Sequence, residues 1–317
     1  MPTPANKPTV AVVIPCYQEE RTIGKVVADF RRELPEARIY VYDNNCTDAT
    51  AANAEMAGAT VRREKRQGKG WVVASIFEQV TEDILVMVDG DDTYEASAVH
   101  ALMAPILKGD ADMTVATRLT SYEDKSFRPL HVAGNRMVCG IINWMFESEV
   151  SDIFSGYRAF TQEAALLIPV SARGFDVETE LTLQSLYRGM VVKEIPAPYR
   201  SRPEGSFSKL NTFSDGIRVL LKLFLIVKSY KPLTFFGSCS IVLFVLGLGA
   251  GARPVYEYIT ERYVHAVPSA ILASALVVLS CFTLGLGLIL NSINLRLLEL
   301  EKLIGKRVPA RGATKDH

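Results

Sequence analysis

The sequence predicts an α/β fold, in which a doubly wound and mostly parallel sheet is followed by amphipathic interface helices and a two-helix transmembrane hairpin. Short apolar runs alternate with helical patterns over the first part of the chain, which is typical of parallel sheets covered by helices. Near the C-terminus, residues 233–252 and 266–290 carry no charge. At about 1.5 Å per helical residue, each stretch can cross a bilayer core of about 30 Å.

The predicted strands are short, apolar and rich in β-branched residues, which indicates burial on both faces. They lie at residues 9–14, 38–42, 60–63, 84–88, 113–118 and 190–195. Segments with the helical spacing of apolar residues separate these strands. The predicted helices lie at residues 21–34, 47–56, 71–80, 96–107, 132–146, 161–168 and 175–187, with an ordered loop at 152–158.

Polar side chains follow four of the predicted strands. They gather around Glu19, Asp43, Asp89 and Arg118. Parallel strands joined by right-handed crossovers end at one edge of a sheet, where open α/β sheets bind ligands. Taken alone, the carboxylates of residues 89–92 (DGDD) fit either a polar turn or a site for a hard divalent cation. Their expected convergence with the other clusters favours a binding site.

The composition excludes some classes of function. The chain has 317 residues, with 35 basic and 35 acidic side chains, so no overall positive charge favours nucleic acid. Its five cysteines follow no metal-binding or disulfide pattern, which indicates reduced thiols and a cytoplasmic main domain. The first eight residues are polar, and we expect no signal peptide.

The C-terminal third is predicted to associate with a membrane. The expected parts are a main domain at residues 1–209, an interface helix at 210–231, a hairpin at 232–291 and a cytoplasmic helical tail at 292–317. In the interface helix, a narrow polar stripe (Asp215, Arg218 and Lys222) divides a wide apolar face. Packing of this helix on the main domain is the alternative. For the hairpin, the alternative is a buried helix pair of a soluble protein.

Basic residues flank the two predicted spans. Arg218, Lys222, Lys228 and Lys231 precede the first span, and Arg296, Lys302, Lys306 and Arg307 follow the second. The two arginines of the intervening loop are offset by two glutamates. The positive-inside rule therefore predicts a multi-pass protein of the inner or cytoplasmic membrane, with the main domain and both termini in the cytoplasm. Five glycines are expected to permit close packing of the helices: Gly247, Gly249, Gly251, Gly285 and Gly287.

An ordered set of motifs resembles family 2 glycosyltransferases. The motifs are residues 13–20 (VIPCYQEE), 41–48 (VYDNNCTD), 68–70 (GKG), 88–92 (VDGDD), 155–158 (SGYR) and 205–209 (GSFSK). Within that family the chain resembles the polyprenyl-phosphate group, which includes dolichol-phosphate mannose synthase, and single-hairpin bacterial relatives. The resemblance covers about residues 9–232. It implies a GT-A-like fold and inverting transfer of a sugar from a nucleotide sugar to a lipid phosphate.

The resemblance implies a donor site at the first strands. Residues expected to bind the donor nucleotide are Pro15, Tyr17, Glu19, Asp43, Lys69, Asp89 and Gly90. Asp43 matches a carboxylate that contacts the base, although a helix-capping aspartate is the alternative. Lys69 matches a cation that faces the diphosphate, although a solvated lysine is the alternative. Asp89 and Asp91 match an acidic pair that binds Mg²⁺ or Mn²⁺, with Asp92 as a third ligand or an outer partner.

The resemblance also implies an acceptor site. Residues expected to bind the acceptor phosphate or the diphosphate are Arg118, Arg136, Arg202, Ser208 and Lys209, with ordinary surface charge as the alternative for the basic ones. Arg118, Arg136 and Asp152 are the predicted catalytic residues. A phosphate monoester is largely ionised at neutral pH, because its second pKa is about 6. Such a nucleophile needs positioning and charge screening more than deprotonation. Two roles are therefore open for Asp152: a base, or a residue that orients Arg158 or a donor hydroxyl.

Four further residues qualify this prediction. Glu178 and Glu180 are secondary catalytic candidates, or else acids at a helix N-terminus. Cys46 stands where the family usually has a small hydroxyl residue, and we expect this difference to have little effect on the site. Trp71 is bulky directly after Gly70 and could alter how the Lys69 loop approaches the diphosphate.

The predicted activity is therefore that of a membrane-anchored glycosyltransferase with polyprenyl phosphate as its acceptor. The resemblance to single-hairpin relatives implies UDP-sugars as the preferred donors, with GDP-mannose second. The expected partners are the nucleotide sugar, polyprenyl phosphate, the bilayer and further copies of the chain, with a tetramer plausible and no nucleic acid. The alternatives are a family 2 transferase that uses a hydroxyl acceptor, and a non-catalytic scaffold that binds nucleotide sugars.

Overall fold

The structure is a computed structural model, which describes residues 7–118, 129–170, 177–200, 224–225 and 227–307. It divides into two compact units, Met1–Leu210 and Asn211–His317. Each unit is described by itself below.

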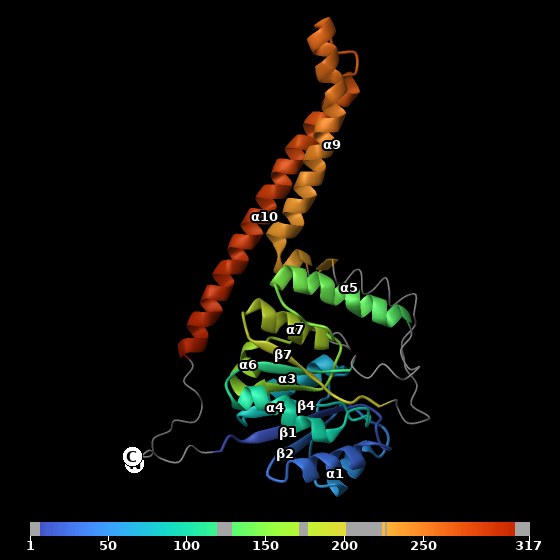
Figure 1. The fold of residues 1–317 in the computed structure, drawn as a ribbon, viewed down its shortest axis with the longest axis vertical. Coiled ribbons are helices and arrows are strands. Elements are labelled where there is room, and N and C mark those ends of the chain that lie inside the picture. Colours follow the sequence, from blue (N-terminus) through green and yellow to red (C-terminus); the bar gives the residue numbers. More distant parts are fainter. Residues whose placement is uncertain (1–6, 119–128, 171–176, 201–223, 226, 308–317) are drawn as a thin grey trace. The chain divides into compact units, whose positions relative to one another are not determined.

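The first unit contains a seven-stranded sheet and its covering helices (Figure 1). The strands are β1 (Val10–Cys16), β2 (Arg38–Asp43), β3 (Thr60–Arg63), β4 (Ile84–Met87), β5 (Met113–Thr117), β6 (Arg158–Thr161) and β7 (Val192–Pro196). The helices are α1 (Ile23–Glu33), α2 (Thr50–Met56), α3 (Lys69–Gln79), η1 (Ala96–Ala98), α4 (Val99–Leu107), α5 (Pro129–Phe146), α6 (Gln162–Leu167) and α7 (Val177–Tyr187).

The sheet is mixed, with the strand order β3-β2-β1-β4-β6-β5-β7. The pairs β1–β2, β2–β3, β1–β4 and β5–β7 are parallel. Strand β6 lies between β4 and β5 and runs antiparallel to both. The carboxyl ends of β1, β2, β4 and β5 therefore lie at one edge, as the sequence predicts.

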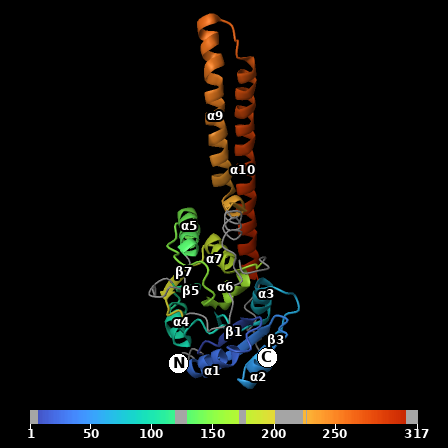
Figure 2. The same ribbon diagram turned by 90° about the vertical axis from the view of Figure 1, so that its right-hand side faces the viewer.

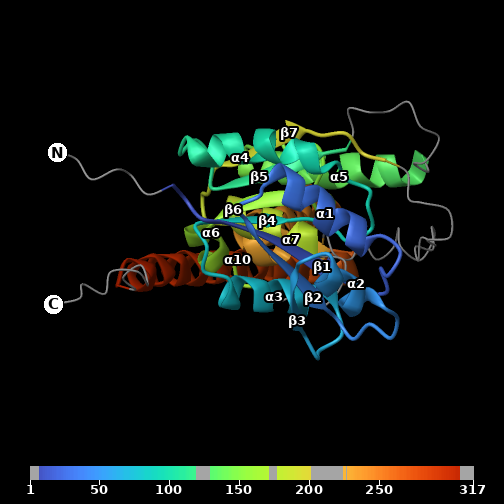
Figure 3. The ribbon, with the colours of Figure 1, turned by 90° about the horizontal axis from the view of Figure 1, so that it is seen from below.

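Helices cover both faces of this sheet, which is why its strands are apolar on both sides (Figure 3). In β1, Val12 and Ile14 pack into one core with residues of α1 and α4. The intervening Ala11 and Val13 pack into a second core with residues of α3 and α7. The doubly wound, mostly parallel sheet is thereby confirmed.

Strand β6 is the main element that the sequence analysis missed. Residues 152–158 were expected to form a loop and residues 161–168 a helix, with no strand between them. The segment has only four residues, Arg158–Thr161, and begins with an arginine. Its strand conformation comes from pairing with β4 and β5, which lie far away in the sequence, so local pattern does not indicate it.

The described part of the second unit consists mainly of a pair of long helices, α9 (Pro232–Glu261) and α10 (Val267–Arg307), which lie side by side (Figure 2). Both are long and apolar enough to cross a membrane by length and composition, and 11% of the most apolar window of each is buried. The charge-free stretches found in the sequence lie almost wholly inside these longer helices. Of the predicted interface helix, residues 224–225 and 227–230 are helical. Residues 210–223 and 308–317 lie outside the described residues.

Small residues bring α9 and α10 together. A Cβ atom built on Gly247 would lie 3.0 Å from Val277 Cγ2, and one on Gly287 would lie 2.9 Å from Phe236 Cβ. Gly251 also contacts α10, whereas a Cβ on Gly249 or Gly285 would meet no atom within 4 Å. The packing prediction is thus confirmed for three of the glycines and wrong for the other two. The buried Ser240 donates a hydrogen bond of 2.9 Å to the carbonyl of Ser280.

Candidate active site

The loop after β1 forms one wall of the site. Pro15 is the second-last residue of β1 and pairs with Tyr42, which places the following turn beside the end of β2. Tyr17 has 43% of its surface exposed. The backbone N–H of Glu19 donates to Thr50 Oγ1 at 2.9 Å, and Thr22 Oγ1 donates to the carbonyl of Gly90 at 2.6 Å. These bonds tie the turn to α2 and to the loop after β4.

Asp43 ends β2 and is buried. Its carboxylate accepts a 2.7 Å hydrogen bond from the N–H of Cys46 and lies 3.9 Å from Arg63 Nε. Asp43 therefore shapes the turn that follows β2. It does not cap α2, whose N-cap residue is Ala49, so the helix-capping alternative is wrong. In the same turn, Cys46 Sγ accepts from the N–H of Gln18 at 3.3 Å.

Asn44, which the sequence analysis did not single out, connects β2 to the loop before α3. Its buried side chain donates to the carbonyls of Glu64 and Arg66, at 3.1 and 2.7 Å. It also accepts from the N–H of Gly68 at 2.7 Å. Residue 44 thus fixes the loop that leads into Lys69. The signal for it was the pair of asparagines directly after Asp43.

Lys69 bridges two carboxylates from distant parts of the chain. Its Nζ lies 2.5 Å from Asp89 Oδ1 and 2.5 Å from Glu178 Oε1. Only 12% of its side chain is exposed, so the solvated-lysine alternative is wrong. Burial disfavours the charged ammonium, but the two carboxylates outweigh burial and raise the pKa of Lys69. The lysine therefore stays positively charged beside the acidic loop.

The loop after β4 places its carboxylates differently. Asp91 is buried and accepts from the hydroxyl of Thr93 at 2.6 Å. Asp92 adopts a left-handed conformation (φ 58°) and pairs with Lys25 Nζ at 2.5 Å. Asp92 is thus committed to an ion pair with α1, which favours an outer position over that of a third metal ligand.

Two glycines make room at this loop. A Cβ on Gly90 would lie 2.8 Å from Cys16 Sγ. A Cβ on Gly156 would lie 2.3 Å from Asp89 Oδ2. The loop of residues 155–158 therefore packs its bare backbone against the Asp89 carboxylate. This contact explains why the SGYR motif has a glycine at position 156.

The carboxylates fit a divalent cation only together with other ligands. Within the described ranges, no three His, Cys, Asp or Glu side chains are grouped so as to hold a metal ion. Asp89 and Asp91 are hard oxygen donors, and Mg²⁺ is commonly bound by one or two carboxylates plus substrate phosphates and water. The residues present therefore suit a metal that arrives with a diphosphate.

Arg118 and Asp152 form a buried bidentate ion pair after β5. Arg118 Nε and Nη2 donate to the two carboxylate oxygens of Asp152 at 2.8 and 2.9 Å. The Arg118 N–H adds a third bond of 3.2 Å, and Asp152 has no exposed surface. Burial lowers the pKa of Arg118, but the hydrogen bonds and charge of Asp152, together with Tyr94 and Tyr199, outweigh burial and raise it. Asp152 orients Arg118, with every carboxylate oxygen engaged.

The expectation that Asp152 orients Arg158 is wrong. The Arg158 guanidinium is fully buried and donates to Ser155 O, Ile153 O and Thr182 Oγ1, at 2.8, 2.9 and 2.8 Å. Because burial disfavours its charge, the pKa of Arg158 is lowered to about 10. Arg158 therefore fixes the loop that packs against Asp89.

The remaining predicted site residues lie on α5, on α7 or outside the described residues. Arg136 is exposed on α5. Glu178 is the partner of Lys69, and Glu180 lies two residues further along α7. Arg202, Ser208 and Lys209 lie outside the described residues.

Comparison with known proteins decides the family. Residues 11–166 match the profile described as glycosyl transferase family 2. The glycosyltransferase AglJ of Haloferax volcanii is 33% identical over 268 residues, which span 84% of this chain and 87% of AglJ. The chain belongs to glycosyl transferase family 2. A dolichyl-phosphate hexose transferase of Haloferax volcanii is 29% identical over 211 residues, with 66% of this chain and 90% of the relative covered. These relatives fit the polyprenyl-phosphate group.

Solved structures agree with the family 2 fold. Glucosyl-3-phosphoglycerate synthase from Mycobacterium tuberculosis, in complex with Mn²⁺, UDP-glucose and phosphoglyceric acid, aligns with a TM-score of 0.56 at 23% identity, over 68% of this chain and 79% of that chain. Its complex with Mg²⁺ and UDP aligns with a TM-score of 0.54 at 22% identity, over the same shares of the two chains. At this identity the likeness establishes the GT-A-like fold.

Trp71 packs against the loop that leads into Lys69, and its predicted effect on how that loop approaches the diphosphate stays a prediction. Helix α3 begins at Lys69, and the preceding Gly68 supplies the positive φ of 131° that the turn needs. The Trp71 ring lies under the Arg66 guanidinium, 4.2 Å from its carbon. Trp71 thus stacks with the loop before α3, and Lys69 is free to point to Asp89 and Glu178.

Proposed function

We propose that this family 2 glycosyltransferase moves a sugar from a nucleotide sugar to polyprenyl phosphate. The observation that carries the proposal is the Arg118–Asp152 pair. Asp152 is fully buried and bonded through both oxygens to a guanidinium. It is therefore poorly suited to abstract a proton from a hydroxyl acceptor, which needs a general base. An ionised phosphate needs positioning and charge neutralisation instead, and Arg118 supplies both.

The donor side is proposed to use Asp43 for the base and Lys69 for the diphosphate, with Pro15, Tyr17, Glu19 and Gly90 lining the nucleotide site. Asp89 and Asp91 would hold Mg²⁺ or Mn²⁺ together with that diphosphate. When bound, the metal neutralises the charge that develops on the leaving nucleoside diphosphate. Lys69 adds a second positive charge next to Asp89.

In the proposed reaction, an acceptor phosphate oxygen attacks the anomeric carbon from the face opposite the nucleotide. The new carbon–oxygen bond forms as the bond to the nucleoside diphosphate breaks, so the configuration inverts. Arg118 orients the acceptor phosphate and Asp152 holds Arg118. Arg136, Arg202, Ser208 and Lys209 are proposed to contact the phosphates as well.

The C-terminal helices are proposed to anchor the enzyme in the inner or cytoplasmic membrane. Their apolar lengths support a transmembrane hairpin, and the flanking basic residues support cytoplasmic termini and a cytoplasmic catalytic domain. In the catalytic unit, α5 exposes Met137 and Trp144, with 42% and 68% of their surfaces accessible. Tryptophan is typical of membrane interfaces, so α5 suits a position at the lipid surface.

The proposal extends to the class of sugar donor and to the oligomeric state. UDP-sugars are the preferred donors and GDP-mannose the second choice. A homo-oligomer is proposed as well, with a tetramer as the form that the resemblance to single-hairpin relatives favours.

A transfer assay tests the proposal. The purified protein would be incubated with labelled nucleotide sugars, polyprenyl phosphate and Mn²⁺, and the lipid product measured. We expect labelled lipid with at least one UDP- or GDP-sugar, and none after the metal is chelated. Transfer to a hydroxyl acceptor in place of the lipid phosphate would overturn the proposal, and nucleotide binding without any transfer would favour the scaffold alternative.

A further inference from the structure

Glu194 holds the backbone on which Asp152 stands. It comes from β7, the edge strand of the sheet. Its Oε1 accepts from the N–H groups of Ser151 and Asp152, at 2.7 and 3.0 Å. Its Oε2 accepts from the hydroxyl of Ser151 at 2.5 Å. One carboxylate thus satisfies two successive backbone donors and a side chain, which fixes the peptide between residues 151 and 152.

The other side of the same segment is held by α5. Asn135 Nδ2 donates to the carbonyl of Ser151 at 2.7 Å. Asn143 donates to the carbonyl of Val150 and accepts from its N–H, both at 2.9 Å. Because α5 fixes the carbonyls and Glu194 fixes the N–H groups of residues 151 and 152, removal of Glu194 frees one side of the segment, while the bonds to α5 keep the segment attached to the domain.

The position of Arg118 depends on this segment. The guanidinium is held by two hydrogen bonds to Asp152, and the backbone N–H of Arg118 makes a third. Bidentate arginine–carboxylate pairs have a demanding geometry. A shift of the Asp152 backbone therefore moves the guanidinium, even though Glu194 itself does not touch Arg118.

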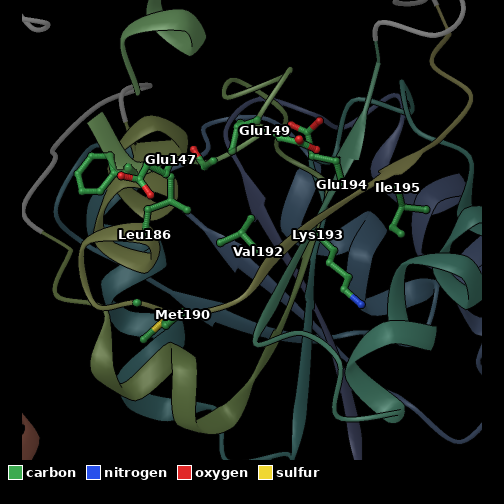
Figure 4. Close-up of a pocket in the computed structure, with 12 residues that line it drawn as sticks. Glu147, Glu149, Leu186, Met190, Val192, Lys193, Glu194 and Ile195 are labelled. Carbon is green, nitrogen blue, oxygen red and sulfur yellow. The ribbon is translucent and has the colours of Figure 1, made fainter. Parts of the chain in front are cut away.

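Glu194 also borders a cavity of about 620 Å³ on the outer side of β7 (Figure 4). The cavity is lined by the end of α5, the end of α7 and successive residues of β7, and Glu149 is another of its lining residues. Ser151 is exposed and Glu194 lines the cavity, so we expect water to reach the two N–H groups once Glu194 is truncated. The segment can then loosen without leaving a buried donor unsatisfied, so the fold is expected to survive the change.

We propose that Glu194 is a positioning residue for the acceptor phosphate, which acts by fixing Asp152 and, through it, the guanidinium of Arg118. The functional part of this inference rests on the proposed transfer to a lipid phosphate. Its structural part, the control of Arg118 by Glu194, does not depend on that reaction.

The kinetic test uses the full-length protein and a short-chain polyprenyl phosphate. Glu194→Ala is expected to raise the KM for the acceptor about tenfold, which corresponds to about 1.4 kcal/mol, while the KM for the nucleotide sugar stays unchanged. Glu194→Gln keeps an oxygen for the two N–H groups and is expected to restore the acceptor KM. Glu149→Ala removes a carboxylate from the same cavity and is the matched control, with no expected change.

A double-mutant cycle separates positioning from a general structural effect. If Glu194 acts through Arg118, Glu194→Ala causes no further loss in an Arg118→Ala background. Additive losses in the double variant would overturn the inference, as would an unchanged acceptor KM in Glu194→Ala. A wild-type protein that does not transfer sugar to lipid phosphate would refute the proposed function and leave the structural part to the next test.

Labelling with an arginine-selective dicarbonyl reagent tests the structural part without any activity. We expect Arg118 to react several-fold faster in Glu194→Ala than in the wild type, and at the wild-type rate in Glu194→Gln and Glu149→Ala. The fully buried Arg158 is the internal control, because faster labelling there would report general unfolding. An unchanged labelling rate at Arg118 in Glu194→Ala would refute the proposed coupling.

Discussion

Lys69 Nζ lies 2.5 Å from Asp89 Oδ1, at the point where the end of β4 meets the beginning of α3. The same ammonium contacts Glu178 of α7. A cation is therefore built into the acidic loop between two carboxylates, so the loop is partly neutralised before any ligand arrives. This arrangement makes a specific prediction for the lysine.

Lys69→Ala is expected to destabilise the protein and abolish donor binding. Without the ammonium, two largely buried carboxylates remain unpaired, and loss of one partner of a buried ion pair costs about 3 kcal/mol. Thermal denaturation of the purified protein measures this loss. Millimolar Mn²⁺ should restore part of the stability, because a cation can again lie beside Asp89. Glu178→Gln is the control, since it leaves Lys69 paired with Asp89, and an equal loss in both variants would contradict the prediction.

Asp152→Asn is expected to impair the acceptor and leave the pH dependence in place. An asparagine amide cannot accept from both nitrogens of Arg118, so the KM for polyprenyl phosphate should rise about tenfold. If the nucleophile is the phosphate, the inflection of kcat/KM near pH 6 belongs to its second ionisation, which occurs at about that pH. The pH profile of the variant should therefore keep this inflection. Its disappearance would assign it to Asp152 and support a general base.

Gly156→Ala is expected to displace Asp89. The new Cβ would lie 2.3 Å from Asp89 Oδ2, so the carboxylate must rotate away from the loop of residues 155–158. We expect Mn²⁺-dependent binding of the nucleotide to weaken about a hundredfold, as measured by calorimetry, because a cation loses a positioned ligand. Gly140→Ala on α5 is the control: nothing lies within 4 Å of its added Cβ, so binding should not change. If Gly156→Ala bound the nucleotide with Mn²⁺ as tightly as the wild type, the prediction that the loop holds Asp89 in place would be wrong.

The positions of Asp43, Asp89 and Arg118 could be predicted from the sequence because each follows an apolar strand of a parallel sheet. The partners of these residues could not be predicted in the same way. Glu178 follows Lys69 by 109 residues, and Glu194 follows Asp152 by 42, so no local pattern joins them. Strand β6 was missed for the same reason, since its conformation comes from pairing with β4 and β5. Local periodicity thus predicted the strand ends at which the candidate site lies, whereas the contacts that orient its side chains depend on tertiary packing.

Glu64 gives a prediction about stability and pH. It accepts hydrogen bonds from Arg66 Nε and Nη2, at 2.9 and 3.0 Å, and also binds the hydroxyl of Ser75. The bonds from Arg66 are the main cause that lowers the pKa of Glu64 to about 2. Because this value lies below that of the unfolded chain, the stabilisation is present above about pH 4.5 and is lost as the pH falls towards 2.

Glu64→Gln should therefore lower the unfolding temperature at neutral pH, and the difference from the wild type should shrink as the pH is reduced from about 5 to about 2. Denaturation followed by circular dichroism across this range provides the measurement. The exposed Glu78 lies on the neighbouring α3, and Glu78→Gln should have little effect at any pH. If the difference in unfolding temperature did not change with pH, the charge of Glu64 would not contribute to stability.

The hairpin offers a comparison between two glycines on one helix. A Cβ on Gly247 would lie 3.0 Å from Val277 Cγ2 and 3.3 Å from the carbonyl of Ala273, whereas one on Gly249 would meet no atom within 4 Å. Gly247→Leu should therefore push α9 away from α10, while Gly249→Leu adds an apolar side chain to an open face. Of the two substitutions, we expect only Gly247→Leu to destabilise the detergent-solubilised protein in thermal denaturation. Overpacking at the helix contact should cost about 1–3 kcal/mol of folding free energy. Equal effects of the two substitutions would contradict the helix contact, because only Gly247 lies at it.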